Sequence, residues 1–249
     1  MKNYFILAAV ISAGIALTSC DPKTTETLIK TGTDILNASN GNGTSTGLTN
    51  DQVIKGLKEA LTVGTNNSTA LTSQLDGFNK NPLIFIPWPA EAQQMKDKMI
   101  QLGFQKQVTD FETSLNRAAE EASKNAAPIF VNAITSMSIS DGFAILNGND
   151  TAATHYLREK TSAPLREAFS PVVGDAIDKV KVTSYWAPLI GTYNMIPGVK
   201  QLNPDLKAYV TQKAVNGLMT LIAQEEVKIR KDPMARVTDL LKKVFGSKK

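Results

Sequence analysis

The stretch that decides the fold is DLKAYVTQKAVNGLMTLIAQEEVKIRK, residues Asp205 to Lys231, the longest helical pattern in the chain. Apolar or small residues recur along it at helical spacing, namely Leu206, Val210, Ala214, Gly217, Leu218, Leu221 and Ile229. Positions three and four apart lie on one face of an α-helix, so the stretch predicts a long helix packed in a core along one side. Pro233 follows the pattern and marks its end, because proline cannot continue a helix.

Shorter helical patterns occupy most of the rest of the chain. Residues 50–61 form an amphipathic pattern, and Thr49 with Gln52 can make a capping box at its start. Further helices are expected at 89–103, 108–122, 141–147, 150–160, 163–180 with a break near Pro171, 184–195, and in a last segment that ends at Gly246. The predicted fold is all-α, a compact irregular multi-helix bundle with one or two short extended segments.

Two short stretches do not follow a helical pattern. NPLIFIPWP, residues 81–89, places an apolar run between prolines and therefore predicts an extended segment with room for one short strand. NGNDT, residues 147–151, gathers oxygen atoms but lacks the alternating acids of a calcium loop. We expect Gly148 to end one helix and Asn149 or Asp150 to cap the next.

Cys20 is the only cysteine in the 249 residues, and it follows a short apolar run. Lys2 precedes that run, which is shorter than the roughly 20 apolar residues needed to span a bilayer. Leu17-Thr18-Ser19-Cys20 resembles a bacterial lipobox, which implies cleavage before Cys20 and acylation of its thiol, for example with palmitate. An ordinary signal peptide with an incidental cysteine is the alternative.

This interpretation predicts three parts. Residues 1–19 are a lipoprotein signal peptide, residues 20–49 a lipidated N-terminus and flexible tether, and residues 50–249 a single helical domain. The protein is then expected in the bacterial cell envelope, anchored by lipid to the inner or outer membrane, with its domain periplasmic or exposed on the cell surface. Asp21, which follows the cysteine, does not decide between the two membranes.

Composition narrows the classes of partner and cofactor. The formal net charge is +4 and no clustered stripe of Lys and Arg is present, so no nucleic-acid partner is expected. With one histidine and one cysteine, no metal site is expected, and no cofactor either. The chain also contains no phosphate-binding glycine loop and no HExxH motif, and its GxSxG match, GTSTG at residues 43–47, lies in the predicted tether and not on a strand-to-helix elbow; these features count against an enzyme.

Several stretches together resemble a bacterial family of unknown function, the domain family numbered 4197. The resemblance extends from Gly56 to Gly246 and rests on GLKEAL (56–61), DGF (76–78), NRAAEEA (116–122), ILNG (145–148), AATHY (152–156), GLM (217–219), EEVKIRKDP (225–233) and VFG (244–246). It implies an exported or lipid-anchored helical protein. It implies no known activity.

A candidate buried polar cluster follows from the long helix. Glu225 lies on its apolar stripe, and a carboxylate that faces a core must be paired, hydrogen-bonded or protonated. Arg117 is the expected partner, and Glu120, Asp141 and Arg230 can join the network. Glu226 and Arg230 are spaced i,i+4, a pair worth a few tenths of a kcal/mol on a solvated face. The cluster either fixes the placement of the helices or forms a polar pocket.

Three aromatic residues and the single histidine are further candidates for a site. Trp88, Tyr185 and Trp186, each beside a proline or another aromatic residue, form a candidate aromatic surface, with packing in the core as the alternative. His155, the only histidine, is expected to point away from the apolar stripe of its helix and to lie at the surface.

Three functions remain open from the sequence. The first is a membrane-anchored, non-catalytic binding or structural module whose partner is an envelope protein, a lipid or a cell-wall component. The second is a carrier that holds an apolar ligand or lipid between its helices. The third is an enzyme that uses a buried carboxylate and arginine cluster. A large enclosed apolar cavity would favour the carrier, and a cleft gathering Arg117, Glu225 and Asp141 would favour the enzyme.

Overall fold

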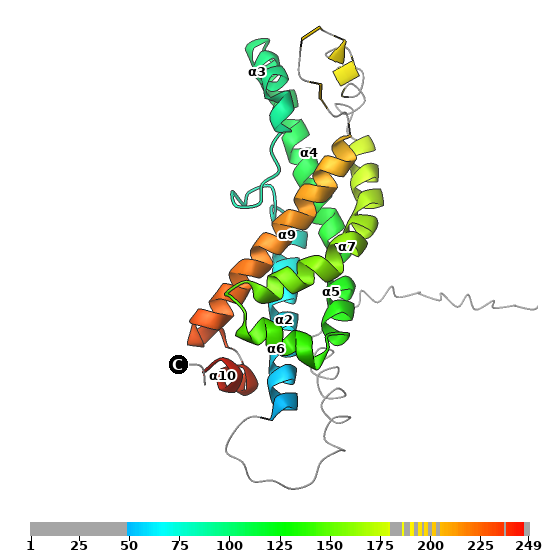
Figure 1. Ribbon diagram of the computed structural model, residues 1–249. Coiled ribbons are helices and arrows are strands. Elements are labelled where there is room, and N and C mark those ends of the chain that lie inside the picture. Colours follow the sequence, from blue (N-terminus) through cyan, green and yellow to red (C-terminus); the bar gives the residue numbers. More distant parts are fainter. Residues whose placement is uncertain are drawn as a thin grey trace, which may run out of the picture. The chain divides into compact units, whose positions relative to one another are not determined.

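The computed structural model describes residues 49–179, 186, 190–191, 194–195, 197–198, 201–202, 205–236 and 238–246. The leader, Cys20, the tether up to residue 48, Tyr185 and most of the helix predicted at 184–195 lie outside these residues. Eight α-helices and two short 3₁₀ turns make up the regular structure of the described part, which contains no strand (Figure 1). The prediction of an all-α, compact multi-helix protein is confirmed.

Helix α2 (Asn50–Ser73) begins with the predicted capping box. The Thr49 hydroxyl accepts a hydrogen bond from the Gln52 N–H, and the Gln52 side chain accepts one from the Thr49 N–H. The second half of α2 buries small hydroxyl side chains instead of large apolar ones. Ser68 and Thr72 each donate to the carbonyl four residues earlier, which satisfies their hydroxyls inside the helix and allows neighbouring helices to approach closely.

The segment between Ser73 and η1 (Ala90–Ala92) forms no strand, and the extended stretch predicted at 81–89 is only partly present: residues 82–84 form a turn, in which the N–H groups of Ile84 and Phe85 donate to the Asn81 carbonyl, and residues 85–89 have no regular structure. The amide side chain of Asn116 occupies the place that a neighbouring strand would take. Its Oδ1 accepts from the Ile86 N–H at 2.8 Å, and its Nδ2 donates to the Ile86 carbonyl at 3.0 Å. Both Ile86 and Asn116 are fully buried, so the backbone of Ile86 is paired without a sheet.

Two antiparallel helices follow this segment. Helix α3 (Gln93–Gln101) ends at a turn through Gly103, which has a φ of 87°, and α4 (Gln105–Ser123) begins directly after it. α3 buries none of its residues, whereas α4 buries one continuous face against the core. The predicted helix ending at Gly103 is therefore confirmed, and α4 extends the predicted 108–122 helix at both ends.

Helices α5 (Ala126–Thr135) and α6 (Ile139–Asn147) are short and mostly apolar. No described helix is by itself long and apolar enough to cross a bilayer. Together α5 and α6 reach that length and composition, but the chain bends by 104° between them. α5 packs on α2 and α7, and α6 packs on the same two helices.

Helix α7 (Ala152–Asp178) corrects one expectation. The two helices predicted at 150–160 and 163–180 form one continuous element that contains both Pro164 and Pro171, and Figure 1 shows it changing direction along its length. Leu165, Phe169 and Val173 continue a single buried stripe across Pro171. Burial of such side chains contributes about 1.5–3 kcal/mol each, which offsets the roughly 3 kcal/mol cost of a proline in a helix.

Helix α9 (Leu206–Lys231) confirms the long helix that was predicted from residues 205–231. It lies against α7, α2 and α4, so the core is built around it (Figure 1). A 3₁₀ turn, η3 (Pro233–Ala235), ends the helix as Pro233 predicted, and α10 (Asp239–Gly246) packs on α2. At this contact a Cβ on Gly56 would lie 2.7 Å from a methyl of Val244, so only glycine allows the close approach.

Candidate functional site

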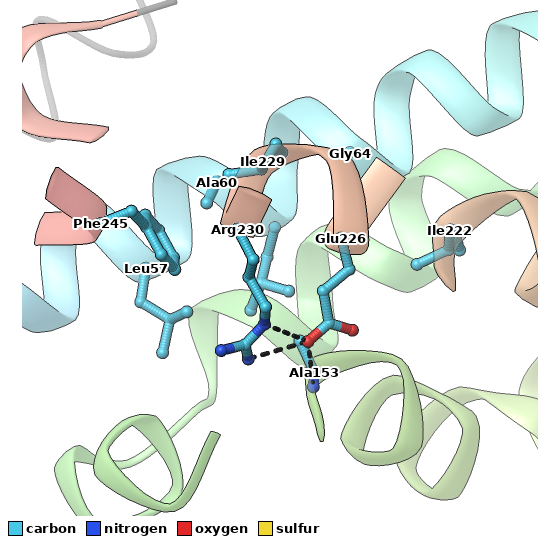
Figure 2. Close-up of a pocket in the computed structure, with 10 residues that line it drawn as sticks. Leu57, Ala60, Gly64, Ala153, Ile222, Glu226, Ile229, Arg230 and Phe245 are labelled. Atoms are coloured by element: carbon cyan, nitrogen blue, oxygen red, sulfur yellow. Dashed lines mark hydrogen bonds and ion pairs between the residues drawn. The ribbon is translucent and has the colours of Figure 1, made fainter. Parts of the chain in front are cut away.

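The first polar centre inside the helical core is the carboxylate of Glu226 on α9, which caps the start of α7. Thr151, at the N-cap of α7, makes no capping hydrogen bond with its own side chain. Glu226, on a distant helix, supplies the missing cap. Its Oε1 accepts from the Ala153 N–H at 3.0 Å (Figure 2). Its Oε2 accepts from the Thr154 N–H and hydroxyl, each at 2.8 Å. A negative charge at a helix N-terminus is also stabilised by the helix dipole.

Arg230 completes this centre one turn further along α9. Its Nε lies 3.0 Å from Glu226 Oε1 and its Nη2 lies 2.8 Å from the same oxygen. Nη2 also donates to the Ile145 carbonyl near the end of α6, at 2.9 Å. The pair joins α9, α7 and α6. Because both carboxylate oxygens already accept hydrogen bonds, Glu226 is placed to hold helices together more than to accept a proton.

A small cavity lies beside this pair, between α2, α7, α9 and α10. Its volume is about 20 Å³. Its lining is mostly apolar and consists of Leu57, Ala60, Leu61, Gly64, Ala153, Ile222, Glu226, Ile229, Arg230 and Phe245 (Figure 2). A cavity of this size holds one water molecule, whereas drug-sized ligands occupy pockets of about 300–1,000 Å³.

The second polar centre lies between α4 and the turn after α2. Glu120 is buried, and its Oε1 accepts from the backbone N–H groups of Phe78 and Asn79, both at 3.1 Å. Its Oε2 lies 2.6 Å from Nη1 of Arg117. The other end of the guanidinium, Nη2, lies 2.5 Å from Asp76 Oδ1. The three side chains fix the turn against α4.

Asp76, in the turn after α2, combines an unusual backbone conformation with a carboxylate whose pKa is lowered. Its φ of 67° lies in the left-handed region, which aspartate tolerates better than most residues. The adjacent Gly77 has no space for a side chain, because a Cβ there would lie 2.2 Å from the Leu71 carbonyl oxygen. Hydrogen bonds from Lys80 and then Arg117 lower the pKa of Asp76 to about 2, and the hydrogen bond to Glu120 raises the pKa of Arg117.

The predicted buried polar cluster is therefore two separate centres and not one. Arg117 pairs with Glu120, as the cluster allowed, but not with Glu225. The buried glutamate of α9 is Glu226, while the Glu225 side chain is 24% exposed and lies 3.6 Å from Lys228. Glu225 Oε2 accepts from Asn67 Nδ2 at 3.1 Å. Glu226 and Arg230 do pair at i,i+4, but not on a solvated face, since their side chains are 8% and 13% exposed.

Asp141 belongs to neither centre. It forms the capping box of α6, where Asp141 accepts from the Ser138 N–H at 3.0 Å and from its hydroxyl at 2.7 Å. These hydrogen bonds lower the pKa of Asp141. No group of three or more His, Cys, Asp or Glu side chains suited to a metal ion occurs among the residues that the structure describes.

The candidate aromatic surface is also corrected. Trp88 and Trp186 are buried, with 3% and 4% exposure, and both contact Phe111. The ring centroids of the two tryptophans lie 5.7 Å apart. Trp88 is drawn inward because the segment that carries it runs against α4, where Asn116 holds the neighbouring Ile86. Tyr185 lies outside the described residues.

His155 is exposed on α7, as predicted. It lies at an open groove of about 650 Å³ between α6 and α7, whose lining includes Asp141, Tyr156, Arg158 and Glu159. The charges along this groove have both signs. Gly148 ends α6 as predicted. The N-cap of α7, however, is Thr151 and neither Asn149 nor Asp150. The Asn149 side chain accepts a hydrogen bond from the Thr151 N–H at 3.0 Å.

The comparisons with known proteins identify a family and no activity. No curated protein and no solved structure matches the chain significantly. Residues 47–246 match a family model described as "Protein of unknown function (DUF4197)". This match includes every described helix. The chain therefore belongs to the DUF4197 family.

Proposed function

We propose that this protein is a lipid-anchored lipoprotein of the bacterial cell envelope and that its helical domain is a non-catalytic binding or structural module. The observation that carries the anchor is the sequence Leu17-Thr18-Ser19-Cys20 directly behind a short apolar leader. One acyl chain holds a protein to a bilayer only weakly, and two or three hold it firmly. Acylated Cys20 would thus tether the domain without crossing the membrane.

The state of the two buried carboxylates supports a non-catalytic role. Glu226 and Glu120 each accept hydrogen bonds on both oxygens, from backbone N–H groups and from an arginine. A general base needs a free lone pair that faces a substrate. These carboxylates instead connect helices to distant backbone, which favours a rigid module over an enzyme.

The hollows of the described part support the same choice over a carrier, because the two larger ones, of about 650 and 340 Å³, are lined mostly by polar or charged residues, and the apolar one is small. The cavity beside Arg230 measures about 20 Å³. A phospholipid acyl chain needs many times that volume. The described core is filled by side chains such as Phe78, Phe130 and Phe169, which are all fully buried.

The anchor is tested by two substitutions in the full chain expressed in its own envelope. Cys20→Ala should move the protein from washed membranes to the soluble fraction, because no thiol remains to be acylated. Ser19→Ala is the matched control, since it keeps a small residue before the cleavage point and should stay in the membranes. Intact-mass analysis should show a chain that begins at Cys20 and carries acyl groups. An unmodified Cys20 would refute the proposed anchor.

A further inference from the structure

The turn between α3 and α4 carries an exposed apolar tip. Ten large hydrophobic side chains are exposed among the described residues, and three of them lie within five residues of this turn. These are Ile100, Leu102 and Phe104, with 37%, 72% and 45% exposure. Apolar side chains gathered at one projecting point indicate an interaction site more strongly than single exposed residues do.

The backbone of the turn is fixed by hydrogen bonds. The Gly103 N–H donates to the Ile100 carbonyl at 3.0 Å, and the Phe104 N–H donates to the Met99 carbonyl at 2.9 Å. With the left-handed φ of 87° at Gly103, this is a Schellman ending of α3. Leu102 and Phe104 are therefore presented by an ordered turn, so little additional conformational entropy is lost when they bind.

The hairpin lies at the edge of the core, against which Met95 and Met99 of α3 pack while they stay partly exposed. α3 buries no residue, and among the described elements it packs on α4 and η1. Figure 1 shows α3 and the start of α4 extending past the ends of α7 and α9. Lys96 Nζ lies 2.5 Å from Glu112 Oε1, and this partly buried pair holds α3 to α4 behind the turn.

The charged side chains nearest the turn are two lysines, and acids follow them at Asp97 and Asp110. From Lys98 to Thr109 the chain contains two lysines and no acidic residue. Lys98 makes a hydrogen bond with Gln101 at 3.1 Å, and Lys106 makes an ion pair with Asp110 on a solvated face. The next acid on the other side, Asp97, accepts a hydrogen bond from Gln93. The exposed apolar residues thus have a lysine on either side.

We propose that this tip, defined as residues 98–106, inserts Leu102 and Phe104 into the surface of a bilayer that contains anionic phospholipids. Lys98 and Lys106 would meet the lipid phosphates while their apolar stems lie along the acyl boundary. A bilayer receives a projecting apolar tip without a matching pocket, whereas a protein partner would need one. The inference rests on the proposed lipid anchor, which would keep the domain close to such a surface and raise the effective concentration of the tip.

The experiment uses a chain that begins at Asp21, so that acylation plays no part in the result. The described core lies wholly between Ile54 and Phe245, and such a chain keeps it complete. It is sedimented with phosphatidylcholine vesicles that do or do not contain phosphatidylglycerol. Helicity is checked by circular dichroism for every variant. Leu102→Ser with Phe104→Ser should weaken binding to anionic vesicles by about tenfold or more.

Leu75→Ser with Leu83→Ser is the matched control, because these leucines are 75% and 50% exposed at another place. This control should bind like the wild type. In a second readout, Leu102→Cys is the only thiol of the shortened chain. An environment-sensitive dye on it should shift to the blue with anionic vesicles, and a dye at Leu75→Cys should not.

Three results would overturn the proposal: no binding to anionic vesicles, equal loss in the tip and control variants, or dimerisation through the tip in place of vesicle binding. Binding that soluble polyglutamate abolishes, with no blue shift at residue 102, would count as the second of these results in another form, since it would show that the lysines bind by charge alone and that Leu102 does not enter the bilayer. The anchor is judged separately by the Cys20→Ala fractionation. Either proposal can therefore fail without the other.

Discussion

Glu226 accepts a hydrogen bond from the backbone N–H of Thr154 at 2.8 Å, although 72 residues separate them. The contact gives α7 the cap that its own Thr151 does not provide. A helix that depends on another helix for its cap cannot form its first turn stably until the two have docked. The start of α7 and the C-terminal half of α9 are thus expected to fold and unfold together.

Glu226→Gln should lower the free energy of unfolding by about 2–4 kcal/mol, because a buried charge pair with Arg230 is broken. The glutamine side chain also has an NH₂ donor where one carboxylate oxygen accepted hydrogen bonds. That donor would face an N–H group or the guanidinium, which are donors too. Urea unfolding followed by circular dichroism measures the change.

Glu225→Gln is the control for this prediction, since it removes a carboxylate from the neighbouring position. The Glu225 side chain is 24% exposed. Its replacement should cost no more than about 1 kcal/mol. Equal losses for the two variants would contradict the capping role of Glu226.

Asp76→Asn should flatten the dependence of stability on acid pH. The pKa of Asp76 is lowered from 3.8 to about 2 in the folded protein by Lys80 and Arg117. A lowered pKa means that the stabilisation is present above pH 3.8 and is lost as the pH falls through 2. The melting temperature of the wild type, measured between pH 5 and 2, should fall more steeply than that of Asp76→Asn. Asparagine suits this comparison because it tolerates the left-handed backbone.

Lys80→Met provides an independent check on the cause. Lys80 makes the largest contribution to the lowered pKa of Asp76. Without it, the pKa should move back toward the usual range of aspartate, as a carboxyl titration by NMR would report. Parallel melting curves for the wild type and Asp76→Asn would count against this account of the turn.

Gly217→Ala should destabilise the protein by about 1–3 kcal/mol through overpacking. A Cβ at this position of α9 would lie 2.7 Å from Phe78 Cε1 and 3.2 Å from Ile84 Cβ. Both of these side chains are buried, so they have little room to move. Chemical denaturation measures the loss.

Gly64→Ala in α2 is the matched substitution with the opposite expectation. Its nearest new neighbours would be Glu225 Cβ at 3.7 Å and Ile229 Cδ1 at 4.0 Å, which are ordinary contact distances. Alanine favours a helix over glycine by about 0.8–1 kcal/mol, so this variant should be as stable as the wild type or more so. If both alanines destabilise alike, close packing at Gly217 is not the cause.

The sequence was sufficient for most helices because their signals are local. The capping box of Thr49, the end of α6 at Gly148 and the stop at Pro233 each depend on neighbours in the chain. The stripe of α9 also predicted its buried side. The stripe did not show that Glu226, and not Glu225, is the buried glutamate. α9 packs on three helices, so its buried surface is wider than one stripe.

The partners of the buried charges could not be predicted, because they depend on contacts between distant segments. Glu120 binds backbone N–H groups, which have no signature in the sequence. The available signal was weak: an aspartate before a glycine at Asp76. The start of α7 gave none, because Asn149, Asp150 and Thr151 are all ordinary N-cap residues, although the Thr151 side chain makes no capping hydrogen bond. Pro171 was interpreted as a break since the packing that offsets its cost is tertiary.

The contact between Trp88 and Trp186 has a practical consequence. They are the only two tryptophans in the chain, and they meet across Phe111 from positions on either side of α4 and α7 in the sequence. Intrinsic fluorescence therefore samples a single junction, without any added label. Emission that turns redder and becomes accessible to acrylamide would reveal that residue 186 has come away from α4, even while the helical signal in circular dichroism stays constant.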